Sequence, residues 1–336
     1  NNVKCLRVGF YNKNPEDLYM KYSNSGMFKL TTNNNTEFYS FFEAQSRIKS
    51  YDIVCFTLFG SISDLFKSLT FEKVIIDECS QATELNSVFP ISYGCNQLVL
   101  IGDEKQLPPC VFSRNSIMKG FSISLFERLR NINIEVSFLN LQYRMHPSIS
   151  AFSSQYFYNN QIINGPNTFL YEPVQGFSWP NPLQRWTFID SSKFDSKEEF
   201  IGLSLINSKE VDIVISIMKN EHIEKYNFSN IGVITPYDAQ KQLIKSKASE
   251  LFGKNNICDV DTVDGYQGME KELIIISLVR ANKTNSLGFL TDYRRLNVSL
   301  TRAKKGLVII GNIKTLESDK VYGDLINHAK ICNCLI

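Results

Sequence analysis

Short apolar runs that end abruptly in polar residues recur along this chain, and they constrain its fold more than any other feature. One of them, Val74–Ile76, ends in the adjacent carboxylates Asp77 and Glu78. A strand buried in a parallel sheet reads as such a continuous run. Segments with helical spacing separate the runs, and this alternation predicts an α/β fold of parallel sheets with helices on both faces. The predicted strands cover residues 3–9, 52–56, 74–76, 97–101, 231–234, 273–279 and 307–310, the last of which is expected to close its sheet.

Periodicity and capping residues mark the helical segments. Pro147 suits the first position of a helix in which Ile149, Phe152 and Tyr156 share a face. Asp292 can cap a later helix, in which we expect Leu296, Leu300 and Ala303 on one face and Arg295 and Arg302 on another. Further helices are expected at residues 36–50, 124–130, 207–219 and 238–251. Residues 11–35 are interpreted as a loop or small insertion and 164–200 as connections with short strands, and no strand is assigned to the polar, glycine-containing stretch 259–270.

The length of 336 residues suits two domains of ordinary size. The helical pattern of residues 124–130 ends near Asn131 and the strand–helix pattern then begins again. We therefore predict one domain over residues 1–130 and a second over residues 131–336. The net charge of +2 neither indicates nor excludes a nucleic-acid binder, because a groove can be basic on a nearly neutral protein.

The cellular compartment and the class of protein can be inferred in part from the cysteines, the histidines and the N-terminus. The eight cysteines stand singly, without a Cys-x-x-Cys pair, and only three histidines accompany them, which argues against a zinc site. Scattered cysteines are typical of reduced proteins of the cytoplasm or nucleus. No apolar run has the length of a membrane span. The chain begins without Met and without a signal-peptide pattern, so we expect a piece of a longer protein.

The paired acids Asp77 and Glu78 are the first candidates for chemistry. They follow a predicted strand, and the carboxyl ends of strands are where open α/β sheets place their active sites. Asp77 could hold Mg²⁺ directly or through water, and Glu78 could take a proton from an attacking water, as an NTPase requires. The alternative is that they are the acidic first turn of a helix, favoured by the helix dipole.

A second polar loop follows the next predicted strand, and it contains Gln106 ahead of Pro108 and Pro109. Gly102 permits a tight exit from the strand, and the two prolines stiffen the loop. Gln106 could contact a γ-phosphate or its attacking water. The alternative is a solvated loop amide.

Taken in order, these segments resemble the helicase core of superfamily 1, in the branch of the nonsense-transcript regulator and the senataxin-like RNA helicases. The resemblance runs from about residue 50 to the C-terminus. It rests on residues 74–84 (VIIDECSQATE, motif II), 98–109 (LVLIGDEKQLPP, motif III), 142–147 (QYRMHP, motif IV), 231–237 (IGVITPY), 261–273 (DTVDGYQGMEKEL) and 288–306 (GFLTDYRRLNVSLTRAKKG, through motif VI).

The resemblance implies two RecA-like P-loop NTPase domains, the first truncated at its N-terminus, with ATP and Mg²⁺ as cofactors. It implies that Asp77 holds Mg²⁺, that Glu78 polarises water and that Gln106 senses the γ-phosphate. In the second domain, Tyr143 would pack on the adenine and Glu270 would contact the ribose. Arg144 and Arg302 would stabilise charge on the transferring phosphoryl group, which suits the guanidinium fork.

The resemblance also implies a partner, single-stranded RNA or DNA, with protein regulators as further partners of a monomer. Thr57, Thr235, Pro236 and Thr262 lie at strand ends on the side where the family holds the strand. Hydroxyl and backbone N–H groups there contact phosphates without reading sequence. The alternative for each Thr is an ordinary turn residue.

One departure from the family concerns the phosphate-binding loop, Gly-x-x-x-x-Gly-Lys-Ser/Thr, which no stretch of the sequence matches. Gly9–Lys13 is the nearest early candidate, and its spacing is wrong. The chain is then either a fragment of an active enzyme, which we favour because the later motifs are intact, or a degenerate pseudo-helicase that binds nucleic acid or protein. A kinase is disfavoured because motif VI has no place there.

Overall fold

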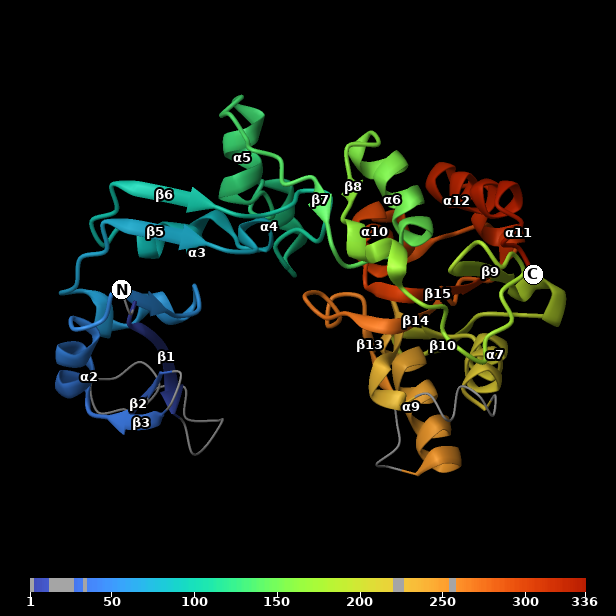
Figure 1. The fold of residues 1–336 in the computed structure, drawn as a ribbon, viewed down its shortest axis with the longest axis horizontal. Coiled ribbons are helices and arrows are strands. Elements are labelled where there is room, and N and C mark those ends of the chain that lie inside the picture. The colour runs from blue at the N-terminus through green and yellow to red at the C-terminus, as the bar shows by residue number, and fades with distance from the viewer. Residues whose placement is uncertain (1–2, 12–26, 33–34, 220–226, 254–257) are drawn as a thin grey trace. The chain divides into compact units, whose positions relative to one another are not determined.

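The computed structural model describes residues 3–11, 27–32, 35–219, 227–253 and 258–336. The chain divides into two units, which Figure 1 displays. The first unit comprises Asn1–Glu104 and Pro108–Val136, and the second comprises Lys105–Leu107 and Ser137–Ile336. The main division thus follows Val136. Part of the predicted loop at residues 11–35 lies outside the described residues.

The first unit begins with a four-stranded sheet in the order β3 (Thr36–Tyr39), β2 (Met27–Thr31), β1 (Cys5–Tyr11) and β4 (Ile53–Cys55). In this sheet only β1 and β4 run parallel, whereas β2 pairs antiparallel with both of its neighbours, so the sheet is mixed. The predicted helix at 36–50 is shorter than expected. Residues 36–39 pair with β2, and α2 (Phe41–Ile48) begins after Ser40, whose N–H and hydroxyl both donate to the carboxylate of Glu43.

A second, two-stranded sheet of the first unit carries the paired acids. It consists of the parallel strands β5 (Lys73–Ile76) and β6 (Gln97–Leu100). Val74 and Ile76 pack against Phe126 of α5 (Leu125–Asn131), whereas Ile75 on the other face is 67% exposed. The two predicted strands therefore exist, but β5 is buried on one face only, and no residue of β6 is fully buried. The helices α3 (Glu84–Ile91) and α4 (Arg114–Met118) complete this part, with short 3-10 turns at Gly60–Ile62, Asp64–Phe66 and Cys79–Gln81.

A five-stranded, wholly parallel sheet organises the second unit. Its order is β13 (Asp259–Thr262), β12 (Ile231–Thr235), β14 (Lys271–Ser277), β15 (Ala303–Gly311) and β9 (Trp186–Asp190). Two expectations are corrected. The strand β15 does not close the sheet, because β9, a short strand from the segment 164–200, pairs with it. The strand β13 lies in the stretch 259–270, to which no strand was assigned because its side chains are polar. The strand stands at the edge of the sheet, where polar side chains are tolerated.

Alternate side chains of this sheet enter two apolar layers, so it is covered on both faces as predicted. Val233, Ile275 and Val308 pack against α7 (Ser208–Met218) and α9 (Asp238–Phe252). Ile234, Ile276 and Ile309 belong to the opposite layer. That layer also receives side chains of α6 (Pro147–Tyr158), α10 (Tyr293–Leu300), α11 (Ile313–Leu316) and α12 (Lys320–Ile331). Each fully buried aliphatic side chain contributes about 1.5–3 kcal/mol.

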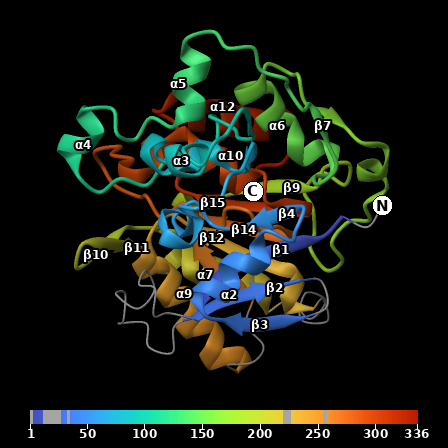
Figure 2. The same cartoon turned by 90° about the vertical axis from the view of Figure 1, so that its left-hand side faces the viewer.

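Smaller elements complete the second unit. The strands β7 (Leu141–Gln142) and β8 (Ile163–Asn164) pair in parallel, and β10 (Glu199–Ile201) and β11 (Ser204–Ile206) form the antiparallel hairpin seen in Figure 2. Short 3-10 turns lie at Pro166–Leu170, Ser191–Phe194, Phe228–Asn230 and Gly288–Thr291. Within the described ranges, no helix is long and apolar enough to cross a bilayer.

The helix α10 corrects the expected placement of Arg302. Asp292 caps it as predicted, by accepting a hydrogen bond from the backbone N–H of Arg294. The helix ends at Leu300, and Ala303 is the first residue of β15. Arg302 therefore lies between helix and strand, and it shares no helical face with Arg295.

Candidate functional site

Three charged side chains of the second unit meet at the amino ends of the neighbouring strands β14 and β15. Arg144 Nε lies 2.6 Å from Glu270 Oε2, and Lys304 Nζ lies 2.5 Å from Glu270 Oε1. Glu270 directly precedes β14, and Lys304 is the second residue of β15. We call these three residues the Arg144 cluster. It holds two cations and one carboxylate, a net charge of +1, so it can attract an anionic phosphate.

Electrostatics keep the carboxylate of this cluster ionised. Burial acts to raise the pKa of Glu270, but hydrogen bonds from Lys304 and Arg144 outweigh that effect and lower the pKa. A carboxylate that remains charged holds both cations in place.

Gln142 fixes Arg144 in this position. Its side-chain oxygen accepts hydrogen bonds from the backbone N–H groups of Arg144 (2.9 Å) and Met145 (2.8 Å). Its amide nitrogen donates to the carbonyl of Met145 at 2.8 Å and to Asn164 Oδ1 at 2.6 Å. The next residue, His146, donates its backbone N–H to the carbonyl of Lys304 at 2.9 Å, which ties the loop to β15. The sequence placed Gln142 ahead of the helix but gave no sign of this organising role.

Tyr143 is the exposed member of the same loop. The residue is 61% exposed, and its backbone carbonyl accepts a hydrogen bond from the hydroxyl of Tyr171 at 3.1 Å. The ring is therefore carried on a fixed backbone and is accessible to a planar ligand.

Arg302, in contrast, is buried, with 3% of the residue exposed. Its Nε donates to the carbonyl of Val298 at 3.0 Å, and its Nη2 donates to the hydroxyl of Thr301 at 2.9 Å. A cation at the carboxyl end of a helix is stabilised by the helix dipole, so Arg302 secures the end of α10. Arg144 reaches the same turn, since its Nη1 donates to the carbonyl of Thr301 at 3.2 Å. The two predicted arginines thus converge on Thr301.

The acids Asp77 and Glu78 lie exposed after β5 in the first unit. Glu78 has a left-handed backbone (φ 51°), which is uncommon for a residue other than glycine and occurs often at functional sites. Its N–H donates to Asp77 Oδ1 at 3.0 Å, and Gln81 donates to Glu78 Oε2 at 2.8 Å. The acids are therefore held by local contacts.

The loops that follow β5 and β6 are locked together beside these acids. The hydroxyl of Ser80 accepts the N–H of Asp103 at 3.2 Å, and the N–H of Cys79 donates to the carbonyl of Ile101 at 2.9 Å. A Cβ on Gly102 would come within 2.9 Å of Cys79 Sγ, so only glycine fits this approach without displacement.

The residues after β5 fit a magnesium ion that is completed by its substrate. Nowhere in the described part of the chain do three or more His, Cys, Asp or Glu side chains group as metal ligands. Mg²⁺ bound with a nucleotide commonly uses only one or two carboxylates and takes its remaining ligands from phosphates and water. The exposed carboxylate of Asp77 suits that role.

Gln106 lies between two residues that are anchored in the second unit. Leu107 is 4% exposed and belongs to a main apolar layer of that unit, and the carbonyl of Lys105 accepts a hydrogen bond from Asn297 at 2.9 Å. Asn297 also donates to the hydroxyl of Tyr158 at 2.8 Å. The sequence did not reveal Asn297, which lies on the buried side of α10.

Within the second unit, the residues predicted to contact nucleic acid lie away from the Arg144 cluster. Thr235 and Thr262 are register partners at the carboxyl ends of β12 and β13, the opposite edge of the sheet from the cluster. Thr235 is fully buried, so its hydroxyl is not presented to a ligand, and Pro236 beside it is half-buried. Thr262 and Thr57 have hydroxyls that accept backbone N–H groups from Gly265 (3.3 Å) and Gly60 (3.0 Å). Both therefore also stabilise turns.

Comparison with known proteins adds a family to this geometry. Two family models, both described as AAA domain, match residues 121–314 and 20–114. The helicase sen1 of Schizosaccharomyces pombe is 40% identical over 294 residues, which cover 84% of this chain and 17% of that protein. A regulator of nonsense transcripts 1 homolog of Neurospora crassa is 37% identical, covering 86% of this chain and 27% of that protein. The probable helicase senataxin of Homo sapiens is 36% identical, and the match covers 83% of this chain and 11% of that protein.

The chain spans less than a third of the length of these relatives. Among solved structures, a complex of an arterivirus nonstructural protein 10 helicase with DNA matches 81% of this chain and 45% of its own. Its TM-score of 0.43 and identity of 13% make it a distant likeness.

Proposed function

The chain belongs to the AAA domain family, in the superfamily 1 helicase branch of the nonsense-transcript regulator and senataxin, and from this we propose that its protein is an ATP-dependent helicase or translocase. Its substrate is single-stranded nucleic acid, preferably RNA, and it moves along the strand from 5′ to 3′. The observation that carries the proposal is the Arg144 cluster, in which one carboxylate holds a guanidinium and an ammonium, and which the exposed Tyr143 directly precedes in the chain.

Each unit contributes residues to hydrolysis in this proposal. Glu78 takes a proton from the attacking water at Oε1, because Gln81 already donates to Oε2. Mg²⁺, held through Asp77, would neutralise charge on the phosphates when bound. Arg144 stabilises negative charge on the transferring phosphoryl group, for which its forked donors are suited.

The remaining predicted residues have supporting roles. Tyr143 offers its ring to the adenine, Glu270 holds Arg144 and reaches the ribose, and Gln106 reports the γ-phosphate to the second unit. Arg302 acts through the end of α10, where it is buried, by fixing the turn that Arg144 contacts. The protein acts as a monomer with protein regulators, in the cytoplasm or nucleus, where eight free cysteines remain reduced.

Glu78→Gln in the full-length protein tests the catalytic half of the proposal. We expect nucleotide binding to persist and phosphate release to fall roughly a hundredfold, the scale of a lost general base. Asp64→Asn is the matched control, since Asp64 is an acid of the same unit that pairs with Lys67 outside the motifs, and it should leave turnover unchanged. Normal turnover in Glu78→Gln would remove Glu78 from the mechanism.

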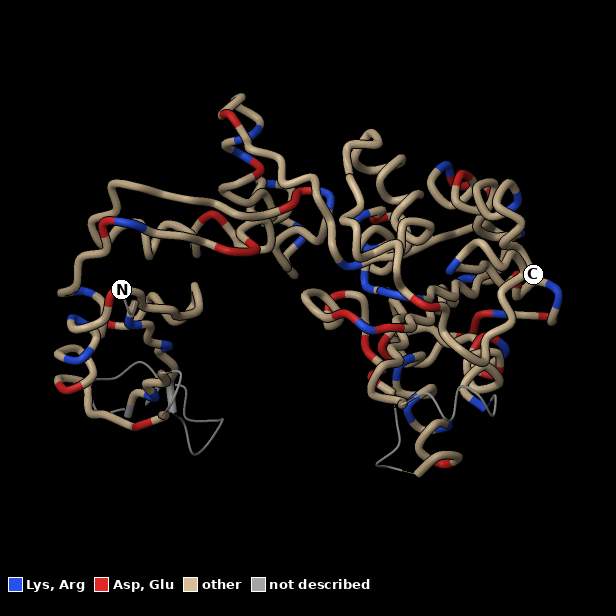
Figure 3. The backbone as a smooth tube through the Cα atoms, viewed as in Figure 1, with Lys and Arg blue, Asp and Glu red and all other residues tan. Residues whose placement is uncertain are grey.

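Binding of single strands tests the other half. Acidic and basic residues are interspersed along both units, as Figure 3 shows, so the overall charge supplies little attraction. We expect affinity that tolerates changes of sequence and weakens as salt rises, because phosphate contacts release counterions. Titrating labelled RNA and DNA strands at two salt concentrations measures both, and a strong preference for one sequence would contradict the proposal.

A non-catalytic binding module remains the second candidate, because no stretch of the 336 residues matches a phosphate-binding loop. On either proposal the 336-residue chain by itself should release no phosphate from ATP. Turnover by the full-length protein, stimulated by single strands, decides between the two.

A further inference from the structure

A strained turn ends the central strand of the second unit, at the edge opposite the Arg144 cluster. Val279 has φ +70°, and the N–H of Arg280 donates to the carbonyl of Leu278 at 2.8 Å, which closes a three-residue γ-turn. A β-branched residue rarely adopts this conformation, so the surroundings must hold it. Glu210 Oε2 accepts the N–H of Val279 at 2.8 Å, and the side-chain amide of Asn207 donates to the carbonyl of Val279 at 2.9 Å.

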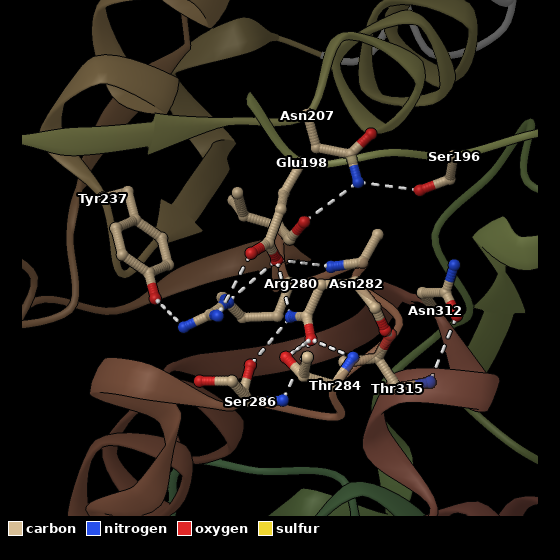
Figure 4. A network of polar contacts seen from close by, with 12 residues as sticks. Ser196, Glu198, Asn207, Tyr237, Arg280, Asn282, Thr284, Ser286, Asn312 and Thr315 are labelled. Carbon is tan, nitrogen blue, oxygen red and sulfur yellow. Dashed lines mark hydrogen bonds and ion pairs between the residues drawn. The ribbon is translucent and has the colours of Figure 1, made fainter. Parts of the chain in front are cut away.

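The turn directs Arg280 into a buried ion pair with Glu198, drawn in Figure 4. Arg280 donates to both carboxylate oxygens, through Nε at 2.9 Å and Nη2 at 3.1 Å, and its Nη1 donates to the hydroxyl of Tyr237 at 3.2 Å. The two charged side chains are only 7% and 9% exposed. Asn282 donates to the same carboxylate at 3.0 Å, so the chain after the turn is also fixed.

This network sets the path of the loop that follows. Asn282 Oδ1 accepts the N–H groups of Thr284 (3.1 Å) and Ser286 (3.0 Å) and folds the loop on itself. Gly288 (φ +56°) then lies directly on Arg280 and Tyr237, where an added Cβ would overlap Arg280 Nη1 and come within 3.0 Å of the Tyr237 hydroxyl. Glycine is required here by conformation and by space, and the next residue is fixed in consequence.

That next residue, Phe289, presents an aromatic ring to solvent with 57% of the residue exposed. The ring of Tyr237 supports it, with centroids 5.5 Å apart, and Arg295 Cζ lies 5.8 Å from its centroid. Asp264 (3.3 Å) and Asp292 (3.7 Å) hold the guanidinium of Arg295 in place. A rigid loop thus displays one ring beside one cation, and the neighbouring acids are already paired.

We propose that Phe289 is a stacking platform for a base of single-stranded nucleic acid, a role that rests on the proposed function. Tyr237 directly follows Thr235 and Pro236, so the platform lies along the carboxyl edge of the sheet that the strand would follow. Any base can stack on an aromatic face, and an adjacent arginine adds attraction to both base and phosphate. Phe289 would thus bind a base at this edge of the sheet, where the buried hydroxyl of Thr235 cannot contact nucleic acid.

The test compares Phe289→Ala with wild-type protein on two probes, an oligouridylate and an abasic strand of the same length, by fluorescence anisotropy. Phe289→Ala should weaken binding of the oligouridylate roughly fivefold to a hundredfold, the range for loss of one stacked base, and should bind the abasic strand as wild type does. Phe289→Trp keeps a ring and should retain affinity. Phe169→Ala is the matched control, because Phe169 is another exposed phenylalanine of the same unit (61% exposed) and lies in the turn Pro166–Leu170, which follows no strand of the five-stranded sheet.

The outcomes separate the two proposals. If wild type binds the oligouridylate and Phe289→Ala binds it equally well, or weakens equally on the abasic strand, the platform is wrong and the proposed function stands. If wild type binds neither strand, both are overturned.

Discussion

The strands β5 and β14 look alike in sequence and differ in the folded chain. Each is an apolar run followed by polar residues, Val74–Ile76 in the first unit and Leu273–Ile276 in the second. In β14 every one of these side chains is buried, because strands pair on both sides and helices cover both faces. In β5 the middle residue, Ile75, is 67% exposed, because it points to the face opposite the apolar cluster of Val74, Ile76 and Phe126. An apolar run therefore predicts a strand, whereas its burial depends on neighbours that the run does not encode.

The functional residues of the two units differ in the same way. The acids Asp77 and Glu78 are exposed and held by contacts within a few residues of each other. Arg144 is held by Glu270 and by the turn at Thr301, far along the chain. The second unit thus assembles its charged groups through tertiary structure, and the first through local conformation.

Arg144→Ala should produce the largest effect that this difference predicts. Loss of the guanidinium should slow ATP hydrolysis by the full-length protein about a thousandfold, or about 4 kcal/mol of activation free energy. Nucleotide affinity should change less. Phosphate release under saturating ATP measures the change, and Lys247→Ala, which breaks an exposed ion pair with Asp212, should have no effect. Unchanged hydrolysis in Arg144→Ala would reduce the cluster to a structural ion pair.

Matched substitutions in the two strands test the contrast in packing directly. Ile275→Ala in β14 should cost roughly 2–5 kcal/mol, because it opens a cavity between the sheet and the helices α7 and α9. Ile75→Ala in β5 should change stability by less than about 0.5 kcal/mol. Urea unfolding followed by tryptophan fluorescence reports the second unit, which contains both tryptophans, Trp179 and Trp186. Hydrogen exchange in β5 and β6 reports the first. Equal costs at the two positions would mean that β5 is also covered on both faces in solution.

Glu210 should make the stability of the second unit depend on pH. Burial raises the pKa of this carboxyl from 4.5 to about 7. The folded state therefore binds the proton more tightly, so the contribution is fully present below about pH 4.5 and is lost as pH rises through about 7. Relative to Glu210→Gln, which keeps the shape and cannot ionise, wild type should lose about 3 kcal/mol across that interval.

Tryptophan fluorescence in urea at several pH values measures this difference. His146, whose pKa burial lowers to about 4, titrates oppositely in the same range, but it is common to both proteins and cancels. Glu250→Gln, on the exposed side of α9, should run parallel to wild type. If the wild-type and Glu210→Gln stabilities also run parallel, the proton on Glu210 contributes nothing.

Short-range sequence signals, such as a capping residue or a proline, correctly predicted where helices begin. Pro147 begins α6 and Asp292 caps α10, as expected. The end of α10 was missed, because Ala303 leaves the helix to pair with β14, a tertiary event. The strand β13 was missed because its aspartates are polar, which only its place at a sheet edge allows.

The candidate site divides similarly. The motifs named Arg144, Glu270 and Arg302, but no pattern revealed that Arg302 is buried or that Lys304 pairs with Glu270. Glu210 stands three residues after Asn207, the spacing of an ordinary helix cap, and Asn207 does accept the N–H of Glu210. Its carboxylate instead holds Val279, from a strand end distant in sequence.

The three residues Lys105–Leu107 restrict how this protein can be dissected. They lie in the first half of the sequence, yet Leu107 packs in an apolar layer of the second unit. The carbonyl of Lys105 accepts a hydrogen bond from the side-chain amide of Asn297. No single cut in the chain can therefore release both units whole. A fragment that starts at Ser137 loses a buried leucine, worth about 1.5–3 kcal/mol, and leaves the amide of Asn297 without that acceptor. An expression plasmid for the second unit alone should carry the loop as a fused peptide.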